Sequence, residues 1–231
     1  VVKKNSNNTI NEAFRVIRTN LELMTDVSTS GGRTIMVTSA NPGSGKTFIT
    51  MNLATTLAIK DKRVAVVDLD LRKASLSSYV GSPSRGVSAF LSGHATLEEI
   101  IVRNANDTNG LDIIPVGAMP PNPAEMLYSP RLRTLLVDLR SRYDYVMLDC
   151  PPVEVVADAK IINRHADMTL FVVRAGLLDR AMLPNIERFY TSGRYHNMAI
   201  ILNGTETVAG SLRSPYGYGY GYGYVYGAKK S

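Results

Sequence analysis

The feature that most constrains the fold is a series of short apolar segments separated by stretches with helical spacing. Strands are predicted at 33–40, 63–70, 111–117, 143–150, 168–175 and 197–204. Several of these segments are apolar almost throughout, as is typical of strands buried on both faces of a sheet. Helices are predicted at 46–60, 130–141, 155–164 and 179–193. This alternation predicts an α/β fold, a parallel β-sheet with helices on both faces, whose ligands bind beyond the carboxyl ends of the strands.

The two ends of the chain depart from this alternation. Near the start, one apolar stripe with helical spacing is formed by Ile10, Phe14, Ile17, Leu21 and Met24. The other face of the same helix carries three charged residues that are neighbours on its surface, Glu12, Arg15 and Arg18. After Leu212 the hydrophobic periodicity stops and a low-complexity Tyr/Gly tail begins. We therefore expect a helical element at 1–30, a globular domain at 31–212 and a flexible tail at 213–231.

Composition limits the class of protein. With 231 residues, 45% hydrophobic and 20% charged, the chain is expected to be one soluble globular domain with a short appendage. The net charge of +6 is scattered without a long basic run, so a nucleic-acid partner is not expected. The single cysteine excludes an internal disulfide and fits a reducing cytosol. No stretch resembles a membrane span or a signal peptide, and Val1 as first residue predicts that the sequence is part of a longer protein.

The segment "ANPGSGKT", residues 40–47, has the spacing of a phosphate-binding loop, with alanine at the first glycine position. It follows a predicted strand and precedes a predicted helix, which is the context that such a loop requires. Gly43 and Gly45 allow backbone N–H groups to turn toward phosphate oxygens, and the helix N-terminus adds partial positive charge. Lys46 is expected to reach the β- and γ-phosphates and the Thr47 hydroxyl to bind Mg²⁺. The segment predicts a nucleotide site for ATP and Mg²⁺.

Three aspartates stand at the ends of predicted strands. Asp68 and Asp70 are two positions apart in "VVDLDLRK", so in a strand both would point to the same face. Asp149 ends the apolar segment "YVMLD", where a carboxylate is costly unless a cation or hydrogen bonds compensate it. Mg²⁺ bound to ATP would supply that cation. Each of the first two aspartates, taken alone, could equally cap a helix or a turn.

Together these motifs carry the resemblance. Several segments of the sequence resemble those of the bacterial tyrosine kinases, known as BY-kinases. They are "ANPGSGKT", "DLDLR", "VMLDCPP", "EAFRVIRTNL", "GVSAFLSG", "GAMPPNPAEML" and the tyrosine-rich C-terminus. The resemblance covers nearly the whole chain. It implies a P-loop fold of the deviant Walker type. It also implies an ATP-dependent protein-tyrosine kinase that phosphorylates its own C-terminal tyrosine cluster in trans and regulates the synthesis and export of capsular or exopolysaccharide.

Roles carry over from the family to matching positions. The resemblance implies that the catalytic residues are Lys46, Asp68, Asp70 and Arg72, with Asp68 as the base for the incoming tyrosine hydroxyl and Arg72 as a phosphate ligand. The expected nucleotide contacts are Asn41, Pro42, Gly43, Ser44, Gly45, Lys46, Thr47, Phe48 and Asn203. The expected metal ligands are Thr47, Asp70 and Asp149. Glu12, Arg15 and Arg18 match an "ExxRxxR" element used in subunit contacts, although alone they would indicate a solvated helix face with weak ion pairs.

The Tyr/Gly tail fits the substrate of such an enzyme. The predicted phosphoacceptors are Tyr216, Tyr218, Tyr220, Tyr222, Tyr224 and Tyr226. Tyrosine holds its hydroxyl far from the backbone, and the glycines between the tyrosines leave the chain pliable. The eighteen residues from Ser214 to Ser231 reach at most roughly 60 Å when extended. A tail of this length could enter the site of a neighbouring copy. Without a kinase-like site, the same segment would indicate an adhesive or disordered segment.

Partners and location also follow from the resemblance. It implies a homo-oligomeric ring, an octamer, together with a transmembrane polysaccharide co-polymerase segment or adaptor and a cognate tyrosine phosphatase. The expected location is the cytoplasmic face of the bacterial inner membrane.

Two alternatives stay open: a partition-type P-loop ATPase switch without kinase activity, and a structural module with an adhesive tail. The first lacks support because Asn41 stands where those ATPases carry a second lysine, and the second because it leaves the phosphate loop and three aspartates without a role.

Overall fold

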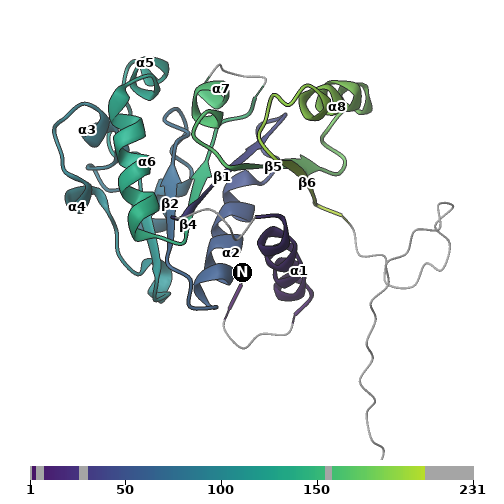
Figure 1. Cartoon of the computed structure of the whole chain (residues 1–231), viewed down its shortest axis with the longest axis horizontal. Coiled ribbons are helices and arrows are strands. Elements are labelled where there is room, and N and C mark those ends of the chain that lie inside the picture. Colours follow the sequence, from purple (N-terminus) through teal and green to yellow (C-terminus); the bar gives the residue numbers. More distant parts are fainter. Residues whose placement is uncertain (1, 4–7, 26–30, 154–157, 206–231) are drawn as a thin grey trace, which may run out of the picture.

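A single parallel sheet organises the computed structural model, which describes residues 2–3, 8–25, 31–153 and 158–205 (Figure 1). The strand order is β3-β2-β4-β1-β5-β6, and every neighbouring pair is parallel. The strands are β1 (Arg33–Ser39), β2 (Val64–Asp68), β3 (Leu111–Ile114), β4 (Tyr145–Asp149), β5 (Met168–Arg174) and β6 (Met198–Asn203). Each lies within a segment predicted as a strand, so the predicted parallel sheet is confirmed. The predicted phosphoacceptor tyrosines lie outside the described residues.

Helices cover both faces of the sheet, as predicted (Figure 1). One face carries α1 (Thr9–Met24) and α2 (Lys46–Ala58). The other carries α3 (Val87–Leu91), α4 (Leu97–Ile100), α5 (Pro123–Leu127), α6 (Pro130–Arg142), α7 (Asp158–Asn163) and α8 (Leu183–Thr191). Short 3₁₀ turns occur at η1 (Leu76–Val80), η2 (Ala105–Asp107) and η3 (Arg180–Met182). The predicted helix at 179–193 is therefore two elements, η3 followed by α8, and the first residues of the one predicted at 155–164 lie outside the described residues.

The core consists of two apolar layers separated by the sheet. In β1, Ile35 and Val37 belong to the layer beneath α1 and α2, whereas Met36 belongs to the layer beneath α6. All three side chains are fully buried. A strand buried on both faces needs apolar residues at successive positions, which is why these strands lack polar alternation. The sheet is thus rigidly held, and its carboxyl ends provide a fixed platform.

The N-terminal helix α1 packs on α2 through only part of its apolar stripe. Phe14 and Leu21 are buried, and the Phe14 ring lies 6.0 Å from the Phe48 ring between centroids. Ile10 and Met24, at the two ends of the stripe, remain 49% and 52% exposed. The amphipathic helix predicted at 10–24 is confirmed, but the described residues cover its apolar stripe only through the middle.

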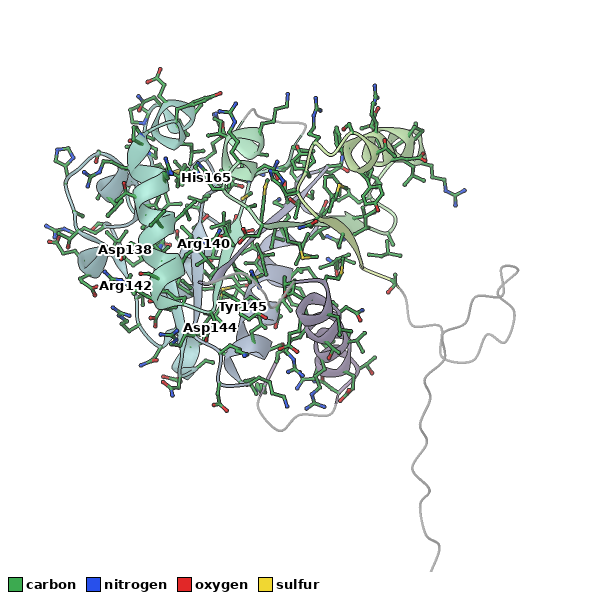
Figure 2. The ribbon with its side chains drawn as sticks, in the orientation of Figure 1. Asp138, Arg140, Arg142, Asp144, Tyr145 and His165 are labelled. Carbon is green, nitrogen blue, oxygen red and sulfur yellow. The ribbon has the colours of Figure 1, made fainter. Side chains whose placement is uncertain are left out.

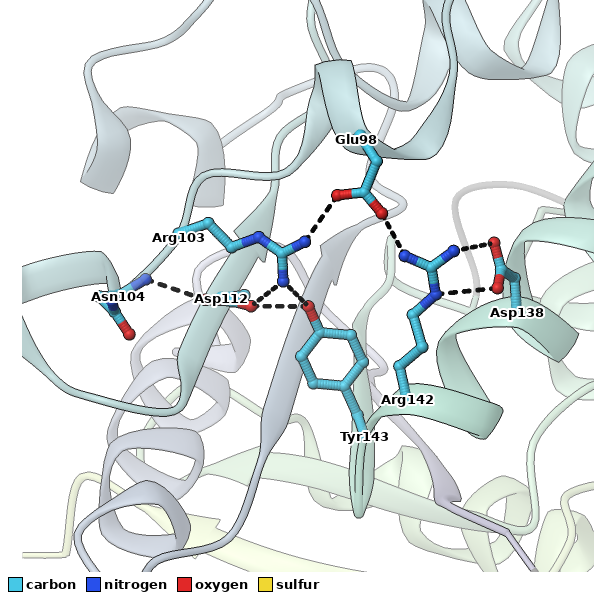
Figure 3. A network of polar contacts seen from close by, with 7 residues as sticks. All are labelled: Glu98, Arg103, Asn104, Asp112, Asp138, Arg142 and Tyr143. Atoms are coloured by element: carbon cyan, nitrogen blue, oxygen red, sulfur yellow. Dashed lines mark hydrogen bonds and ion pairs between the residues drawn. The ribbon is translucent and has the colours of Figure 1, made fainter.

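Polar contacts close the amino ends of the strands, opposite the phosphate loop. Asp112 of β3 accepts hydrogen bonds from the Tyr143 hydroxyl at 2.6 Å, from Arg103 Nη1 at 3.0 Å and from the Asn104 backbone N–H at 2.9 Å (Figure 3). Glu98 joins Arg103 to Arg142 in the same network. Burial, together with the bond to Asp112, raises the pKa of the Tyr143 hydroxyl. This network fixes the start of β3 against the end of α6.

Further ion pairs continue along this end of the sheet. Arg140 of α6 pairs with Asp167 at 3.0 Å, and Asp144 pairs with Arg63 at 3.2 Å. Figure 2 shows Asp138, Arg140 and Arg142 along α6, with Asp144 and Tyr145 where the chain enters β4. Charged pairs therefore join the segments at the amino ends of the sheet, opposite the strand ends that meet the phosphate loop. Among the described residues, no helix combines the length and apolar character that crossing a bilayer requires.

Candidate functional site

The loop between β1 and α2 has the backbone shape of a phosphate cradle. Gly43 and Gly45 have φ angles of 76° and 92°, in the left-handed region that glycine adopts without strain. Gly45 is also the N-cap of α2, so the loop leads directly into a helix N-terminus. A Cβ atom added at Gly45 would lie 2.3 Å from Asn203 Nδ2. A side chain at position 45 would therefore be strained in its backbone and would displace the Asn203 amide.

Two side chains from the far strands brace this loop. Arg174 at the end of β5 donates a hydrogen bond from Nη1 to the Gly43 carbonyl at 2.8 Å. Asn203 at the end of β6 donates from Nδ2 to the Ser44 carbonyl at 2.9 Å. In a trans peptide the N–H points opposite to the carbonyl, so drawing these carbonyls toward β5 and β6 turns the following N–H groups toward the opposite side. Arg174 and Asn203 thus help to shape an anion-binding loop.

Lys46 and Thr47 begin α2 and point toward the strand ends. Lys46 is 8% exposed, and burial lowers the pKa of its ammonium group, while nearby Asp149 and Asp70 act in the opposite direction. The Thr47 hydroxyl donates a hydrogen bond to Asp149 Oδ2 at 2.6 Å. An ammonium group, a hydroxyl and two carboxylates therefore gather at the N-terminus of one helix.

Asp68 and Asp149 lie side by side at the carboxyl ends of neighbouring strands. They are paired in the register of β2 and β4. Asp68 is fully buried and accepts hydrogen bonds from the backbone N–H and the hydroxyl of Ser77, at 2.9 and 2.8 Å. Burial raises the pKa of Asp68 to about 6 and that of Asp149 to about 7. Both carboxyl groups thus titrate near neutral pH, where a proton acceptor is useful.

The second oxygen of Asp149 provides a test of whether Mg²⁺ fits. Asp149 is 1% exposed, and its Oδ1 atom is buried with no hydrogen-bond partner. A buried carboxylate oxygen without a partner is costly, and a cation would compensate it. Within the described ranges, no three His, Cys, Asp or Glu side chains gather as a metal cage. Mg²⁺ at nucleotide sites is commonly held by one or two carboxylates together with substrate phosphates, so the residues present fit the ion.

Asp70 differs from what the sequence pattern predicts. The prediction that Asp68 and Asp70 share one face of a strand is wrong, because β2 ends at Asp68. Asp70 stands in the following turn, where its Oδ1 accepts a hydrogen bond from the Lys73 backbone N–H at 3.2 Å. Its own N–H donates to Asp68 Oδ1 at 3.3 Å, which keeps the two carboxyl groups close. Asp70 therefore caps a turn as well as lying beside the site.

Arg72 is oriented by a residue that the sequence pattern did not reveal. Its Nε donates to Asp158 Oδ2 at 3.0 Å, and the Asp158 side chain is only 3% exposed. Among the described residues, the terminal nitrogens of Arg72 have no hydrogen-bond partner. The guanidinium is thus held by one nitrogen while its outer edge stays available to an anion. Ser77, Asp158 and Arg174 are site residues that sequence reasoning missed.

The remaining predicted residues fall into two places. In the loop, Asn41 accepts hydrogen bonds through its carbonyl from Ser39 and Ser44, Pro42 is exposed, and Phe48 packs against α1. The predicted subunit-contact residues lie on α1, where Glu12 pairs with Arg15 and Arg18 Nη1 donates to the Thr56 carbonyl of α2 at 3.4 Å. An intrahelical ion pair is thus present on this face, and the role of α1 in subunit contacts stays a prediction.

These features together define the class of protein. A parallel sheet, a glycine loop braced at a helix N-terminus, a buried lysine and carboxylates at the adjacent strand ends are the fold and site of a P-loop nucleotide-binding protein. Consistent with this class, a family model described as an AAA domain matches residues 32–179.

Comparison with known proteins identifies the family within that class. The tyrosine-protein kinase YwqD of Bacillus subtilis is 32% identical over 208 residues, which cover 90% of this chain and 85% of that protein. The solved kinase domain of the Escherichia coli tyrosine kinase ETK superposes with a TM-score of 0.77 and 34% identity, covering 90% of this chain and 80% of that one. The chain belongs to the bacterial tyrosine kinase family, as the sequence motifs predict.

Several relatives are much longer than this chain. A Klebsiella pneumoniae protein named as a tyrosine-protein kinase in the cps region is 37% identical over 195 residues, which are 84% of this chain but 26% of that protein. The chain spans about a fifth to a quarter of the length of several of the curated relatives it matches. It therefore corresponds to one region of those proteins.

Proposed function

We propose that this chain is an ATP-dependent protein-tyrosine kinase that phosphorylates the tyrosine cluster of its C-terminal tail. The observation that carries the proposal is the junction of β1, α2, β2 and β4, where Lys46, Thr47, Asp68 and Asp149 meet beneath a braced glycine loop. This junction supplies cationic, metal-binding and basic groups within one site. Family membership and the six tail tyrosines supply the acceptor.

The binding roles follow from the contacts. The loop N–H groups and the α2 N-terminus would hold the phosphates of ATP, and Lys46 would neutralise the terminal ones. Thr47 and Asp149 would hold Mg²⁺, with Asp70 close by as a further oxygen donor. Bound Mg·ATP supplies the phosphoryl group and offsets negative charge during its transfer. Burial of Lys46 and Asp149 strengthens their electrostatic effect, because little water lies between these charges and the site.

Asp68 is our candidate base. Its carboxylate oxygens accept from Ser77 and from the Asp70 backbone, which fixes the side chain. A pKa of about 6 leaves it mostly ionised at pH 7 yet basic enough to accept a proton from a phenol as the phosphoryl group transfers. Arg72, held by Asp158, would orient a phosphate oxygen through its outer edge. These residues provide positioning and electrostatic stabilisation, which are the main requirements of phosphoryl transfer.

The biological setting is proposed on the family. We infer that the kinase regulates capsular or exopolysaccharide synthesis and export, because one relative is named for the cps region. Its partners would be other copies in a ring, a transmembrane co-polymerase segment or adaptor, and a tyrosine phosphatase. The proposed location is the cytoplasmic face of the inner membrane.

Intact mass after incubation with ATP and Mg²⁺ tests the activity. We expect successive additions of one phosphate each, absent in Lys46→Met and in a chain truncated after Leu212, because the first variant loses the phosphate-binding ammonium and the second loses the acceptors. Lys60→Met, a substitution on an exposed residue just beyond α2, serves as the matched control and should behave as wild type. ATP turnover without any change in protein mass would instead favour the switch ATPase.

A further inference from the structure

The free edge of the sheet at β6 carries an exposed apolar groove. It lies between α8 and β6 and is lined by Leu183, Ile186, Glu187 and Tyr190 of α8 and by Met198 and Ile200 of β6, with a volume of about 600 Å³. We call it the β6–α8 groove. Ile200 and its neighbour Leu202 are each 58% exposed, and Tyr190 is 65% exposed. Glu187 is the only charged residue that lines it.

An exposed apolar sheet edge is normally paired with another strand or covered by another segment. β6 is the last strand of the sheet, so backbone N–H and C=O groups on its outer side have no strand partner among the described residues. Sheet edges with exposed apolar side chains readily accept another strand. Met198, Ile200 and Leu202 fall on one face by strand alternation, which is the face toward α8. A strand added beside β6 could therefore extend the sheet and fill the groove with its own alternate side chains.

The segment that follows β6 has an alternating sequence that suits a strand in this groove. The described residues end at 205, directly after β6, and the Tyr/Gly tail follows in the same chain. From Tyr216 to Tyr226 every second residue is tyrosine, so an extended backbone would place all the rings on one face. The residues between them are glycine except Val225, which leaves the other face almost without side chains. We propose that the β6–α8 groove is a docking site for the unphosphorylated tail of the same chain, added as a strand beside β6.

Chain length sets how much of the tail can dock. The connection from Gly204 to Pro215 is twelve residues and extends to roughly 40 Å, which is ample for a return beside a six-residue strand of roughly 20 Å. A six-residue strand can pair with about six tail residues. The tyrosine-bearing stretch that needs the shortest connection back to β6 is 216–221. Tyr216, Tyr218 and Tyr220 are therefore the residues that occupy the groove. Tyr222, Tyr224 and Tyr226 extend beyond it.

Docking of this kind is sensitive to phosphorylation. A phosphotyrosine carries about −1.5 to −2 charges, and its burial in an apolar groove beside Glu187 is unfavourable. The docked state therefore belongs to the unmodified tail, and modification of Tyr216, Tyr218 or Tyr220 releases it. The groove would keep acceptors beside the chain that carries them until another site competes for them. This docking does not require that the chain be a kinase.

Hydrogen exchange of β6 without nucleotide tests the proposal. In the full chain, backbone N–H groups of 198–203 on the outer side of β6 should exchange roughly tenfold more slowly than in a chain truncated after Leu212. Ile200→Lys with Leu202→Lys should abolish the difference. Val137→Lys on α6, at a site of matched 59% exposure, should leave it intact. Replacing Tyr216, Tyr218 and Tyr220 by Phe should retain protection, whereas replacing them by Ser should remove it.

Three outcomes would overturn the proposal. The first is equal exchange in the full and truncated chains, which would leave β6 without a tail partner. The second is protection that disappears on dilution, which would assign the groove to a second copy. The third is protection that survives the Ser replacements, because the tyrosine rings would then not be the groups that dock. None of these measurements involves ATP, so their failure is separate from failure of the proposed kinase activity.

Discussion

Asp149 has a carboxyl group that is only half satisfied by hydrogen bonds in the described chain. One carboxyl oxygen accepts from Thr47, and the other is buried without a partner. Such a group favours its protonated form until a cation arrives, which is why burial raises its pKa to about 7. The same property that makes Asp149 suited to a metal ion makes the nucleotide-free fold sensitive to pH.

We expect Asp149→Asn to flatten the dependence of stability on pH. The native pKa of about 7 lies above the ordinary value of 3.8, so between these values the folded state holds a proton that the unfolded state has lost. The contribution is fully present below pH 3.8, and the free energy of unfolding falls as pH rises from there to 7, by about 4 kcal/mol at most. Denaturant unfolding at pH 5, 6 and 7 measures it.

Asp68→Asn is the comparison for this prediction. Asp68 has a pKa of about 6, so its contribution should be lost mainly below pH 6, whereas that of Asp149 continues to fall up to pH 7. Excess Mg²⁺ with ATP should stabilise wild type more at pH 7 than at pH 5, because the cation favours the ionised carboxylate. A wild-type pH slope that matches that of Asp149→Asn would contradict the account of this residue.

Some residue roles could be predicted from sequence and others could not. Lys46, Thr47 and Asp149 stand in motifs whose spacing determines their position in any fold of this type. Asp158 forms an ion pair with Arg72, which lies 86 positions away in the sequence, and no local sequence pattern indicates that pair. Arg174 was accessible in principle, since it ends a predicted strand at the edge where ligands bind. Side-chain roles are predictable when one short segment determines them, and not when distant elements must meet.

At the scale of elements, the strands were predictable because each is nearly continuous apolar sequence. The short helices α3, α4 and α5 were not predicted, because four or five residues are too few for a helical period. Local signals were nevertheless present: Thr96 and Glu99 form a capping box at the start of α4, and Pro123 begins α5. The end of β2 at Asp68 was missed because "DLDL" continues the alternation of the strand. Periodicity locates long elements and misplaces their ends.

The phosphate loop is an element whose shape depends on two other strands. We expect Gly45→Ala to be far more damaging than Gly43→Ala, although both positions have positive φ. Alanine at 43 meets nothing within 4 Å and should cost about 1 kcal/mol of strain. Alanine at 45 adds a clash with Asn203, which displaces the Asn203 brace as well. Affinity for a fluorescent ATP analogue should fall at least roughly tenfold more for Gly45→Ala.

The double variant Gly45→Ala with Asn203→Ala tests the cause of that difference. Removing the Asn203 amide removes the clash, so Gly45→Ala should lower nucleotide affinity less in the Asn203→Ala background than in wild type. If Gly45→Ala costs the same affinity in both backgrounds, steric conflict with Asn203 is not the reason for the glycine. Unfolding temperatures of all three variants separate loss of binding from loss of fold.

For the whole molecule, the tail is where charge changes most. Six phosphotyrosines would add roughly −9 to −12 charges to a chain of +6, all within eleven residues. Phosphorylated tails of neighbouring copies would repel one another, and we propose that this repulsion weakens the assembly. We therefore propose that the molecule combines a fixed nucleotide site at the carboxyl ends of its sheet with a long acceptor tail that reaches the site of another copy.

The most direct test of transfer between copies mixes two variants of the chain, neither of which can phosphorylate its own tail. One copy carries Lys46→Met with an intact tail, and the other has an intact site but is truncated after Leu212. Intact mass after addition of ATP and Mg²⁺ should show phosphate on the Lys46→Met copy only in the mixture, because the truncated copy supplies the site and the variant supplies the tyrosines. If the Lys46→Met copy stays unmodified while wild type alone gains phosphate, transfer between copies is wrong. If wild type gains none either, the kinase proposal itself fails.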